Sequence, residues 1–149
     1  MALSAAGWAA LRISEGYKKK VYRDIVGIPT VCMGTTAGLT KADVGRRFGA
    51  EACDKRDRAA VLLAENAVRG NVKVKLTQAQ FDALVSFTYN VGAAAFRKST
   101  LLTVLNRGDY KGAAAQIRRW VYAGGYKVRG LVKRREEEAR PFEEVESWQ

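Results

Sequence analysis

Two carboxylic acids and a hydroxyl near the start of the chain are of the types that glycoside hydrolysis requires. Glu15 follows an apolar stretch with helical spacing and precedes Gly16, a residue type that commonly ends helices. Asp24 and Thr30 lie in the segment 21–33, which is rich in β-branched residues and interrupted by glycine. A helix end that faces a small hairpin can place two carboxyl groups on opposite sides of a bound sugar bond. One acid can then donate a proton while the other stays ionised in a wetter setting.

The spacing of these residues resembles the catalytic motif of the phage-type lysozymes, glycoside hydrolase family 24. In that motif an aromatic-x-Asp ends nine residues after the Glu of a Glu-Gly pair, and a Thr follows six residues later, as in this chain. The resemblance extends in family order over nearly the whole chain and is greatest to endolysins of lambdoid phages. Its later motifs are Ser86-Phe87-Thr88-Tyr89-Asn90-Val91-Gly92, Ser99-Thr100-Leu101-Leu102, Asn106-Arg107-Gly108-Asp109, Arg118-Arg119-Trp120 and residues 130–136.

The resemblance implies hydrolysis of the β-1,4 bond between N-acetylmuramic acid and N-acetylglucosamine in peptidoglycan, for host cell lysis. Glu15 would be the general acid, and Asp24 with Thr30 would hold the attacking water. Such a pair inverts the sugar configuration when its carboxyl groups are ~6.5–9.5 Å apart. The chain departs from the family at Met33 and Thr35, where an aromatic residue and a histidine are common.

By the same resemblance, four residues are candidates for binding substrate: Tyr89, Asn90, Phe96 and Thr100. Two arginines of a late helix are candidates for orienting Glu15: Arg134 and Arg135. Simpler interpretations remain open for some of these positions. Asn90 is also suited to end a helix, Phe96 to pack in the core, and Trp120 to lie on the buried face of an amphipathic helix.

The composition excludes several other chemistries. The chain has no histidine, which excludes Ser-His-Asp and Cys-His catalysis and argues against zinc amidases and peptidases. We expect neither a metal nor another cofactor. The net charge of +11 attracts polyanions. The resemblance implies peptidoglycan as the partner, and the charge adds anionic wall or outer-membrane polymers as further partners. Nucleic acid is not required, and the chain is expected to be a monomer.

Two other functions compete with this interpretation. A lytic transglycosylase would use Glu15 alone and release anhydro-sugars without water, but it would leave Asp24 and Thr30 without a role. A basic polyanion-binding module is suggested by the positive charge and by Trp120, Tyr122 and Tyr126 among basic residues. It does not explain the three catalytic candidates.

The sequence also bears on where the protein acts. No apolar run approaches the ~20 residues of a membrane helix, and residues 2–11 lack the basic start of a signal peptide. We expect synthesis in the host cytoplasm and action in the periplasm or wall, without a signal peptide or anchor in this chain. Cys32 and Cys53 are either free buried thiols or a disulfide, which would require an oxidising compartment.

These residues need an α+β, lysozyme-like scaffold to position them. We expect one domain over residues 1–149, with a small β lobe at about 15–50, a helical lobe from 1–14 and 51–149, and a cleft between the lobes. Ser4 is expected to cap a first helix that ends near Ser14, and residues 17–36 to form short strands. Thr77 and Asp109 are expected to cap later helices, and residues 123–125 to interrupt the helical segment that precedes them. The expected later helices are 51–69, 78–89, 99–106, 110–121 and 130–139, with a last one starting at Pro141.

Overall fold

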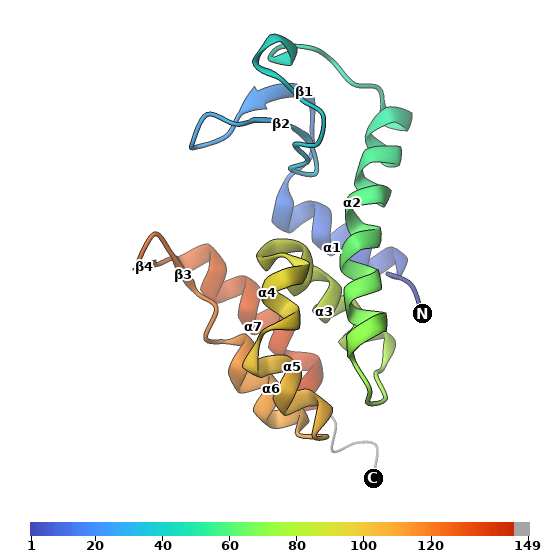
Figure 1. The fold of residues 1–149 in the computed structure, drawn as a ribbon, viewed down its shortest axis with the longest axis vertical. Coiled ribbons are helices and arrows are strands. Elements are labelled where there is room, and N and C mark those ends of the chain that lie inside the picture. Colours follow the sequence, from blue (N-terminus) through green and yellow to red (C-terminus); the bar gives the residue numbers. More distant parts are fainter. Residues whose placement is uncertain (145–149) are drawn as a thin grey trace. The chain divides into compact units, whose positions relative to one another are not determined.

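Seven α-helices and two two-stranded antiparallel sheets form the part of the chain that the computed structural model describes, residues 1–144 (Figure 1). The fold class is therefore α+β, as expected. Internal contacts group the residues into two units. The sheet unit is Trp8–Leu62, and the helical unit is Met1–Gly7 with Leu63–Gln149. The sheet unit thus extends beyond the expected segment 15–50 at both ends. No helix within residues 1–144 is both long and apolar enough to cross a membrane.

The sheet unit is built around a short hairpin. Strand β1 (Lys18–Arg23) pairs antiparallel with β2 (Pro29–Cys32), with Tyr22 opposite Thr30. The later turns of α1 (Ala5–Glu15) precede the hairpin, and a 3₁₀ turn (Lys41–Asp43) and the first turns of α2 (Ala50–Asn71) follow it. A small apolar cluster fills the unit, consisting of Val21, Val31, Cys32 and Cys53 with Tyr17, Leu39 and Phe48 packed against them.

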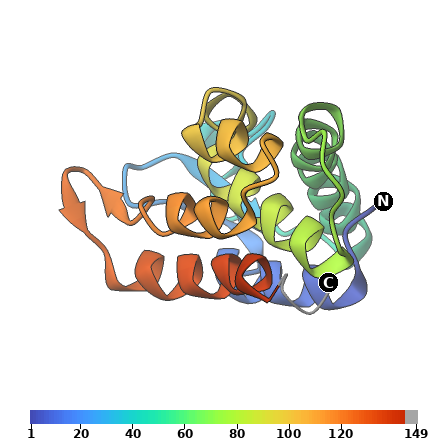
Figure 2. The same ribbon diagram turned by 90° about the horizontal axis from the view of Figure 1, so that it is seen from below.

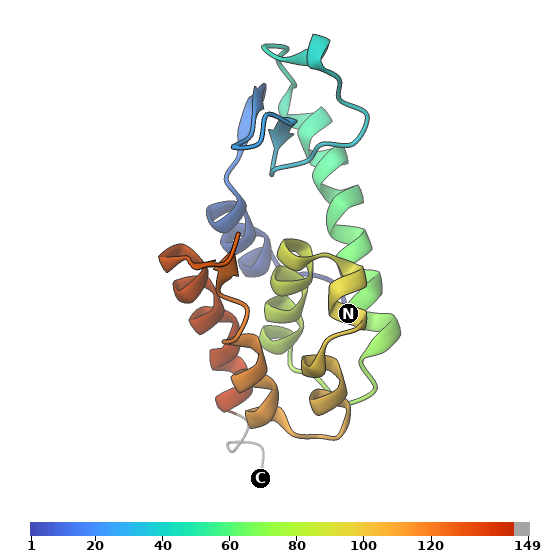
Figure 3. The ribbon, with the colours of Figure 1, turned by 60° about the vertical axis from the view of Figure 1, so that its left-hand side comes forward.

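The helical unit contains the rest of the helices. Their order is α3 (Gln78–Val91), α4 (Ala93–Arg97), α5 (Thr100–Asn106), α6 (Tyr110–Ile117) and α7 (Arg129–Glu143), which can be followed in Figure 3. Helices α6 and α7 pack against each other along their length (Figure 2), and α7 also packs on α3. The segment Ala93–Arg97, which lies between two of the expected helices, is itself the helix α4. Strands β3 (Tyr122–Ala123) and β4 (Tyr126–Lys127) connect α6 to α7.

Side-chain caps define where these helices begin, as the sequence predicted. Ser4 Oγ accepts the Gly7 N–H at 3.0 Å at the start of α1. Thr77 accepts from the Gln80 N–H at 3.0 Å, and the Gln80 side chain accepts from the Thr77 N–H at 2.9 Å. This reciprocal capping box satisfies two backbone donors that the helix cannot satisfy itself. Asp109 and Ser99 cap α6 and α5 with a single side-chain bond each, from the Gly112 and Leu102 N–H groups.

One expectation about the end of the chain is wrong, and a second is incomplete. Pro141 does not start a new helix but lies inside α7. It is in the last turn, where the missing N–H removes a single helical hydrogen bond, and the neighbouring Phe142 and Ala139 are fully buried. Residues 123–125 form more than a break, because Tyr122 pairs with Lys127 around Gly124 and Gly125. Both glycines have positive φ, 57° and 83°, which a two-residue type I′ hairpin turn requires.

We predict that Thr77→Ala lowers the free energy of unfolding by about 1 kcal/mol, because it removes the cap of α3 and one half of the capping box. Urea unfolding followed by circular dichroism would measure the change. Thr103→Ala, at an exposed position inside α5, is the matched control and should change stability by less than ~0.5 kcal/mol. Equal losses in the two variants would show that the capping box does not stabilise α3.

Candidate active site

Asp24 and Thr30 are connected through the backbone of a single residue, Ile28. The Ile28 N–H donates to Asp24 Oδ1 at 2.8 Å, and its carbonyl accepts from Thr30 Oγ1 at 2.8 Å. The same carbonyl accepts the Asp24 N–H at 2.9 Å. Asp24 Oδ1 also accepts the Val26 N–H at 3.0 Å. The loop between β1 and β2 therefore fixes both side chains in one arrangement.

This arrangement leaves specific atoms available for chemistry. Both hydrogen bonds to the Asp24 carboxylate use Oδ1, and no residue within 1–144 donates to Oδ2. Thr30 is buried, and its proton is committed to the Ile28 carbonyl, so Oγ1 retains lone pairs that can accept a hydrogen bond. A water beside these two oxygens could donate to both.

Glu15 is the last residue of α1 and is half-buried. Gly16 follows with φ 80°, and its N–H donates to the Arg12 carbonyl at 2.8 Å, which ends the helix as predicted. The Glu15 carboxyl lies beside Gly34, since a Cβ built on Gly34 would be 3.9 Å from Glu15 Oε1. The turn that contains Gly34 therefore lies next to the candidate acid.

That turn, residues 31–35, continues directly from β2 and Thr30. Val31 and Thr35 exchange both backbone hydrogen bonds, at 2.9 and 3.0 Å. The Thr35 hydroxyl also donates to the Val31 carbonyl at 2.9 Å. Cys32 has φ 59°, a left-handed conformation that is uncommon for residues other than glycine. Such a conformation persists only where surrounding contacts hold it.

Three contacts with α2 supply this restraint, and we call them the turn clamp. Cys32 forms a disulfide with Cys53, with an S–S distance of 2.06 Å. The Met33 N–H donates to Asp57 Oδ1 at 3.1 Å. Arg56 Nε donates to Thr35 Oγ1 at 3.0 Å. The three α2 residues have helical spacing and share one face, and Thr35, which departs from the family pattern, receives the Arg56 bond.

The turn clamp contains charged groups with incomplete hydrogen bonding. Asp57 is fully buried, and Asp57 Oδ2 and Arg56 Nη2 are buried without a hydrogen-bond partner among the described residues. Desolvation raises the pKa of the Asp57 carboxyl above its ordinary value of 3.8, because it outweighs the Met33 N–H and two nearby arginines. Sequence reasoning missed Arg56 and Asp57, since nothing in α2 alone distinguishes them from other charged residues of that helix.

In the helical unit, the two candidate arginines belong to one buried network with Glu138. Arg135 is almost fully buried and donates to Glu138, to Asn90 Oδ1 and, at 2.8 Å, to the Trp120 carbonyl. Arg134 donates to Glu138 at 3.2 Å and to the Ser86 carbonyl at 3.0 Å. The C-cap of α3 is Gly92. Asn90 therefore does not end the helix but accepts a bond from Arg135.

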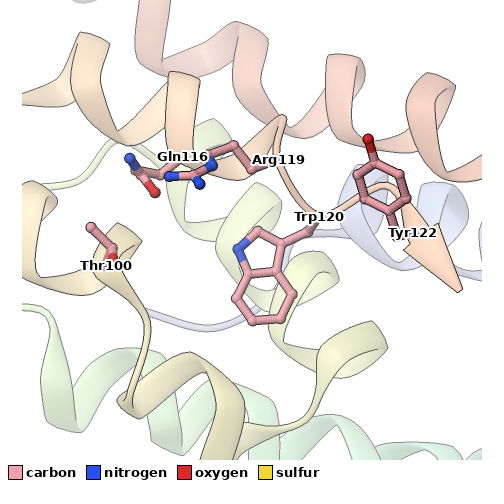
Figure 4. A pocket seen from close by; sticks show the side chains of 5 residues that line it. All are labelled: Thr100, Gln116, Arg119, Trp120 and Tyr122. Carbon is pink, nitrogen blue, oxygen red and sulfur yellow. The ribbon is translucent and has the colours of Figure 1, made fainter. Parts of the chain in front are cut away.

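A recess of about 360 Å³ in the helical unit is lined by Thr100, one of the residues predicted to bind substrate. In Figure 4 the Trp120 indole lies between Thr100 and Tyr122, and the other lining residues are Gln116 and Arg119. Trp120 was expected on the buried face of an amphipathic helix, but α6 ends at Ile117. Its ring is half-buried and packs edge-to-face on Phe87 with the centroids 5.4 Å apart. The run Arg119-Trp120-Val121-Tyr122 could have indicated three of these lining residues, but nothing in the sequence indicated Gln116.

The remaining candidates lie in the same unit. Phe96 is fully buried, which favours the packing interpretation over contact with substrate. Tyr89 is half-buried near the end of α3. Within residues 1–144, no cluster of histidine, cysteine, aspartate and glutamate has an arrangement that could hold a metal ion.

Comparisons with known proteins agree on one family. The sequence model described as Phage lysozyme matches residues 12–138. The SAR-endolysin of Bacteriophage PS119 is 41% identical over 126 residues, which cover 83% of this chain and 73% of the relative.

Solved structures give the same result. An endolysin from Escherichia coli O157:H7 phage FAHEc1 has a TM-score of 0.83 at 35% identity, covering 97% of this chain and 95% of its own. The muramidase domain of SpmX from Asticaccaulis excentricus has a TM-score of 0.83 at 33% identity, covering 94% and 96%.

Asp57→Asn should change how stability depends on pH. The native pKa of Asp57 is raised above the unfolded value of 3.8, so the native state binds more protons between these two values. This group therefore stabilises the wild-type fold fully below the unfolded pKa, and the contribution is lost as pH rises through the native pKa. Asparagine retains an oxygen for the Met33 N–H and does not ionise. We expect the stability of Asp57→Asn relative to wild type to increase with pH.

Urea unfolding at a series of pH values from about 4 to 7 would measure this difference. A relative stability that is constant or falls with pH would contradict an unfavourable buried charge at Asp57.

Proposed function

The chain belongs to the phage lysozyme family, and on that basis we propose that Glu15, Asp24 and Thr30 carry out its reaction. The protein is a muramidase, a glycoside hydrolase that degrades bacterial peptidoglycan in the manner of phage endolysins. The bond that we assign to it is the β-1,4 linkage between N-acetylmuramic acid and N-acetylglucosamine. The observation that supports the residue assignment best is the Ile28 backbone, which holds Asp24 and Thr30 together.

In this mechanism Glu15 is the general acid. Its proton passes to the glycosidic oxygen as the bond to the anomeric carbon breaks, so the leaving sugar departs as a neutral alcohol. The position of Glu15 supports this role, because the carboxyl is half-buried at a helix end beside the turn 31–35.

Asp24 and Thr30 then act on the attacking water. The water donates one hydrogen to Asp24 Oδ2 and the other to Thr30 Oγ1, and its oxygen attacks the anomeric carbon from the face opposite the leaving group. Asp24 takes up the proton that the water loses. The two backbone bonds to Oδ1 prevent the carboxylate from rotating, and this prior orientation lowers the entropic cost of the step. Attack by water on the opposite face inverts the sugar configuration.

The helical unit would contribute substrate binding. Thr100 and its recess offer a hydroxyl, an amide, a guanidinium and two aromatic rings, which suit sugar hydroxyls and N-acetyl groups. Asn90 and Tyr89 are further candidates near the end of α3. Arg134 and Arg135 remain our candidates for orienting Glu15 by the family resemblance, and both guanidinium groups form ion pairs with Glu138.

We propose that the protein acts at the bacterial cell wall. We further propose that it acts as a monomer with one lysozyme-like domain. Relatives are named SAR-endolysins and endolysins. The Cys32–Cys53 disulfide is consistent with the periplasm, where disulfides persist. The positive net charge would favour association with anionic wall or outer-membrane polymers.

Glu15→Gln should abolish the release of wall fragments, with kcat reduced by at least ~1,000-fold, because glutamine cannot donate the proton. Mass spectrometry of fragments from purified peptidoglycan would detect reducing muramic-acid ends with the wild-type chain. Proton NMR of fresh products should show the α-anomer first. Glu51→Gln, at an exposed position in α2, is the control and should retain activity.

Two results would contradict this mechanism. Anhydro-muramic ends would identify a lytic transglycosylase and remove the water-activating roles of Asp24 and Thr30. Initial release of the β-anomer would show that the configuration is retained.

Thr30→Val should lower kcat by about 100-fold or more, since the methyl group that replaces the hydroxyl cannot hold the water. Thr30→Ser keeps the hydroxyl and should remain within about 10-fold of wild type. Thermal unfolding of both variants would identify any loss of fold. A valine variant that is folded and fully active would remove Thr30 from the mechanism.

A further inference from the structure

Strand β1 borders an open groove of about 760 Å³ within the sheet unit. Its second wall is the segment 44–47, which pairs with the edge of β1 that does not face β2. The Val21 N–H donates to the Arg46 carbonyl, and the Gly45 N–H donates to the Val21 carbonyl, both at 2.9 Å. The lining residues are Lys18, Lys19, Lys20, Val21, Tyr22, Arg23, Val44, Gly45 and Arg47.

All the charged residues that line this groove are positive. No lining residue is acidic, and five are cationic: Lys18, Lys19, Lys20, Arg23 and Arg47. None of the five forms an ion pair with an acid in the part of the chain that the structure describes. Other arginines do so, since Arg58 pairs with Asp54 at 2.8 Å and Arg118 with Glu136 at 2.8 Å. Neighbouring like charges repel one another, and an anion bound between them would offset that repulsion.

The rest of the lining is apolar. Val44 is partly exposed, and the Lys18 ammonium lies 4.5 Å from the centroid of the Tyr22 ring. Lysine stems add further methylene surface below their charged ends. The groove therefore suits a ligand that combines carboxylates with small apolar groups, rather than a bare inorganic anion.

The position of the groove indicates the source of such a ligand. Strand β1 continues without a break into Asp24, and Tyr22 of the groove lies opposite Thr30 in the hairpin. A glycan strand bound for cleavage at these residues would bring its neighbouring substituents to the same strand. In peptidoglycan these substituents are short peptide stems, which carry alanine methyl groups and free carboxylates.

We propose that the groove along β1 binds the carboxylates of peptidoglycan peptide stems. This inference rests on the proposed function for the identity of the polymer, and it assigns β1 a role in substrate selection in addition to carrying Asp24. Exposed charge pairs contribute little individually, so the cations act together and their effect weakens with added salt.

The test compares two matched double variants, Lys18→Gln/Lys20→Gln and Lys73→Gln/Lys75→Gln. Each removes two exposed lysines separated by one residue, and only the first pair belongs to the groove. Both are made in the Glu15→Gln background, so that binding is measured without turnover. The ligand is purified sacculi, either native or with the stem carboxyls converted to amides, in a sedimentation assay.

We expect the groove variant to bind native sacculi about 3- to 10-fold more weakly than its parent. On amidated sacculi it should bind like its parent, and the control variant should match its parent on both. Equal binding of native sacculi by the two double variants would overturn the proposal. So would a loss that persists after amidation, or a loss seen only with vesicles of anionic phospholipid.

A kinetic comparison separates this proposal from the proposed function. With the catalytic residues intact, the groove variant should show a raised KM and an unchanged kcat on stem-bearing fragments. It should match wild type on glycan strands stripped of their stems. Failure of the wild-type chain to cut either substrate would refute the muramidase assignment, whereas a lowered kcat on stripped strands would refute the role of the groove.

Discussion

The turn clamp is the constraint on which the proposed catalytic hairpin depends. A disulfide and two side-chain hydrogen bonds attach residues 32, 33 and 35 to Cys53, Asp57 and Arg56 on one face of α2. A two-stranded hairpin alone is at best marginally stable in water, and this one has a non-glycine residue with positive φ at its end. Cross-linking to a long helix compensates for both weaknesses and places Gly34 beside Glu15.

The turn clamp fixes the conformation of the turn 31–35 at some cost in the stability of the fold. Among residues 1–144, one oxygen of the buried Asp57 carboxylate and one nitrogen of the Arg56 guanidinium lack a hydrogen-bond partner, and both are unfavourable in a desolvated interior. An apolar pair of similar volume would avoid that cost. It would not, however, accept the Met33 N–H or hold the Thr35 hydroxyl. Functional sites commonly keep such strained or poorly satisfied groups where the geometry of nearby residues matters.

The sequence predicted best what depends on neighbouring residues. The caps at Ser4, Thr77 and Asp109 bind backbone donors within three residues, so their local pattern was sufficient. Family spacing likewise identified a helix-end acid and a hairpin pair. The Gly124-Gly125 hairpin was missed although its signal was present, because a pair of glycines was interpreted only as a break.

What the sequence could not provide were partners that are distant along the chain. The role of Asp57 in the turn clamp depends on its bond to Met33, which lies 24 residues away in the sequence. The same holds for Arg135 and Asn90, which are 45 residues apart. Trp120 was placed in a helix because its apolar spacing continues past Ile117. Beyond the end of α6, the Trp120 carbonyl accepts a hydrogen bond from the Arg135 side chain.

The division of the chain into units has a consequence for how the protein is assembled during synthesis. The sheet unit is one continuous segment, Trp8–Leu62, whereas the helical unit needs the first seven residues together with those from Leu63 onward. Ser4 bonds to Asp82, 78 residues later. As the ribosome extends the chain, the N-terminal turn can first bond to Glu65 and Arg69 of α2, and its bond to Asp82 must wait until α3 has been made. The sheet unit can acquire its native pairing earlier, because nearby contacts close at a smaller entropic cost.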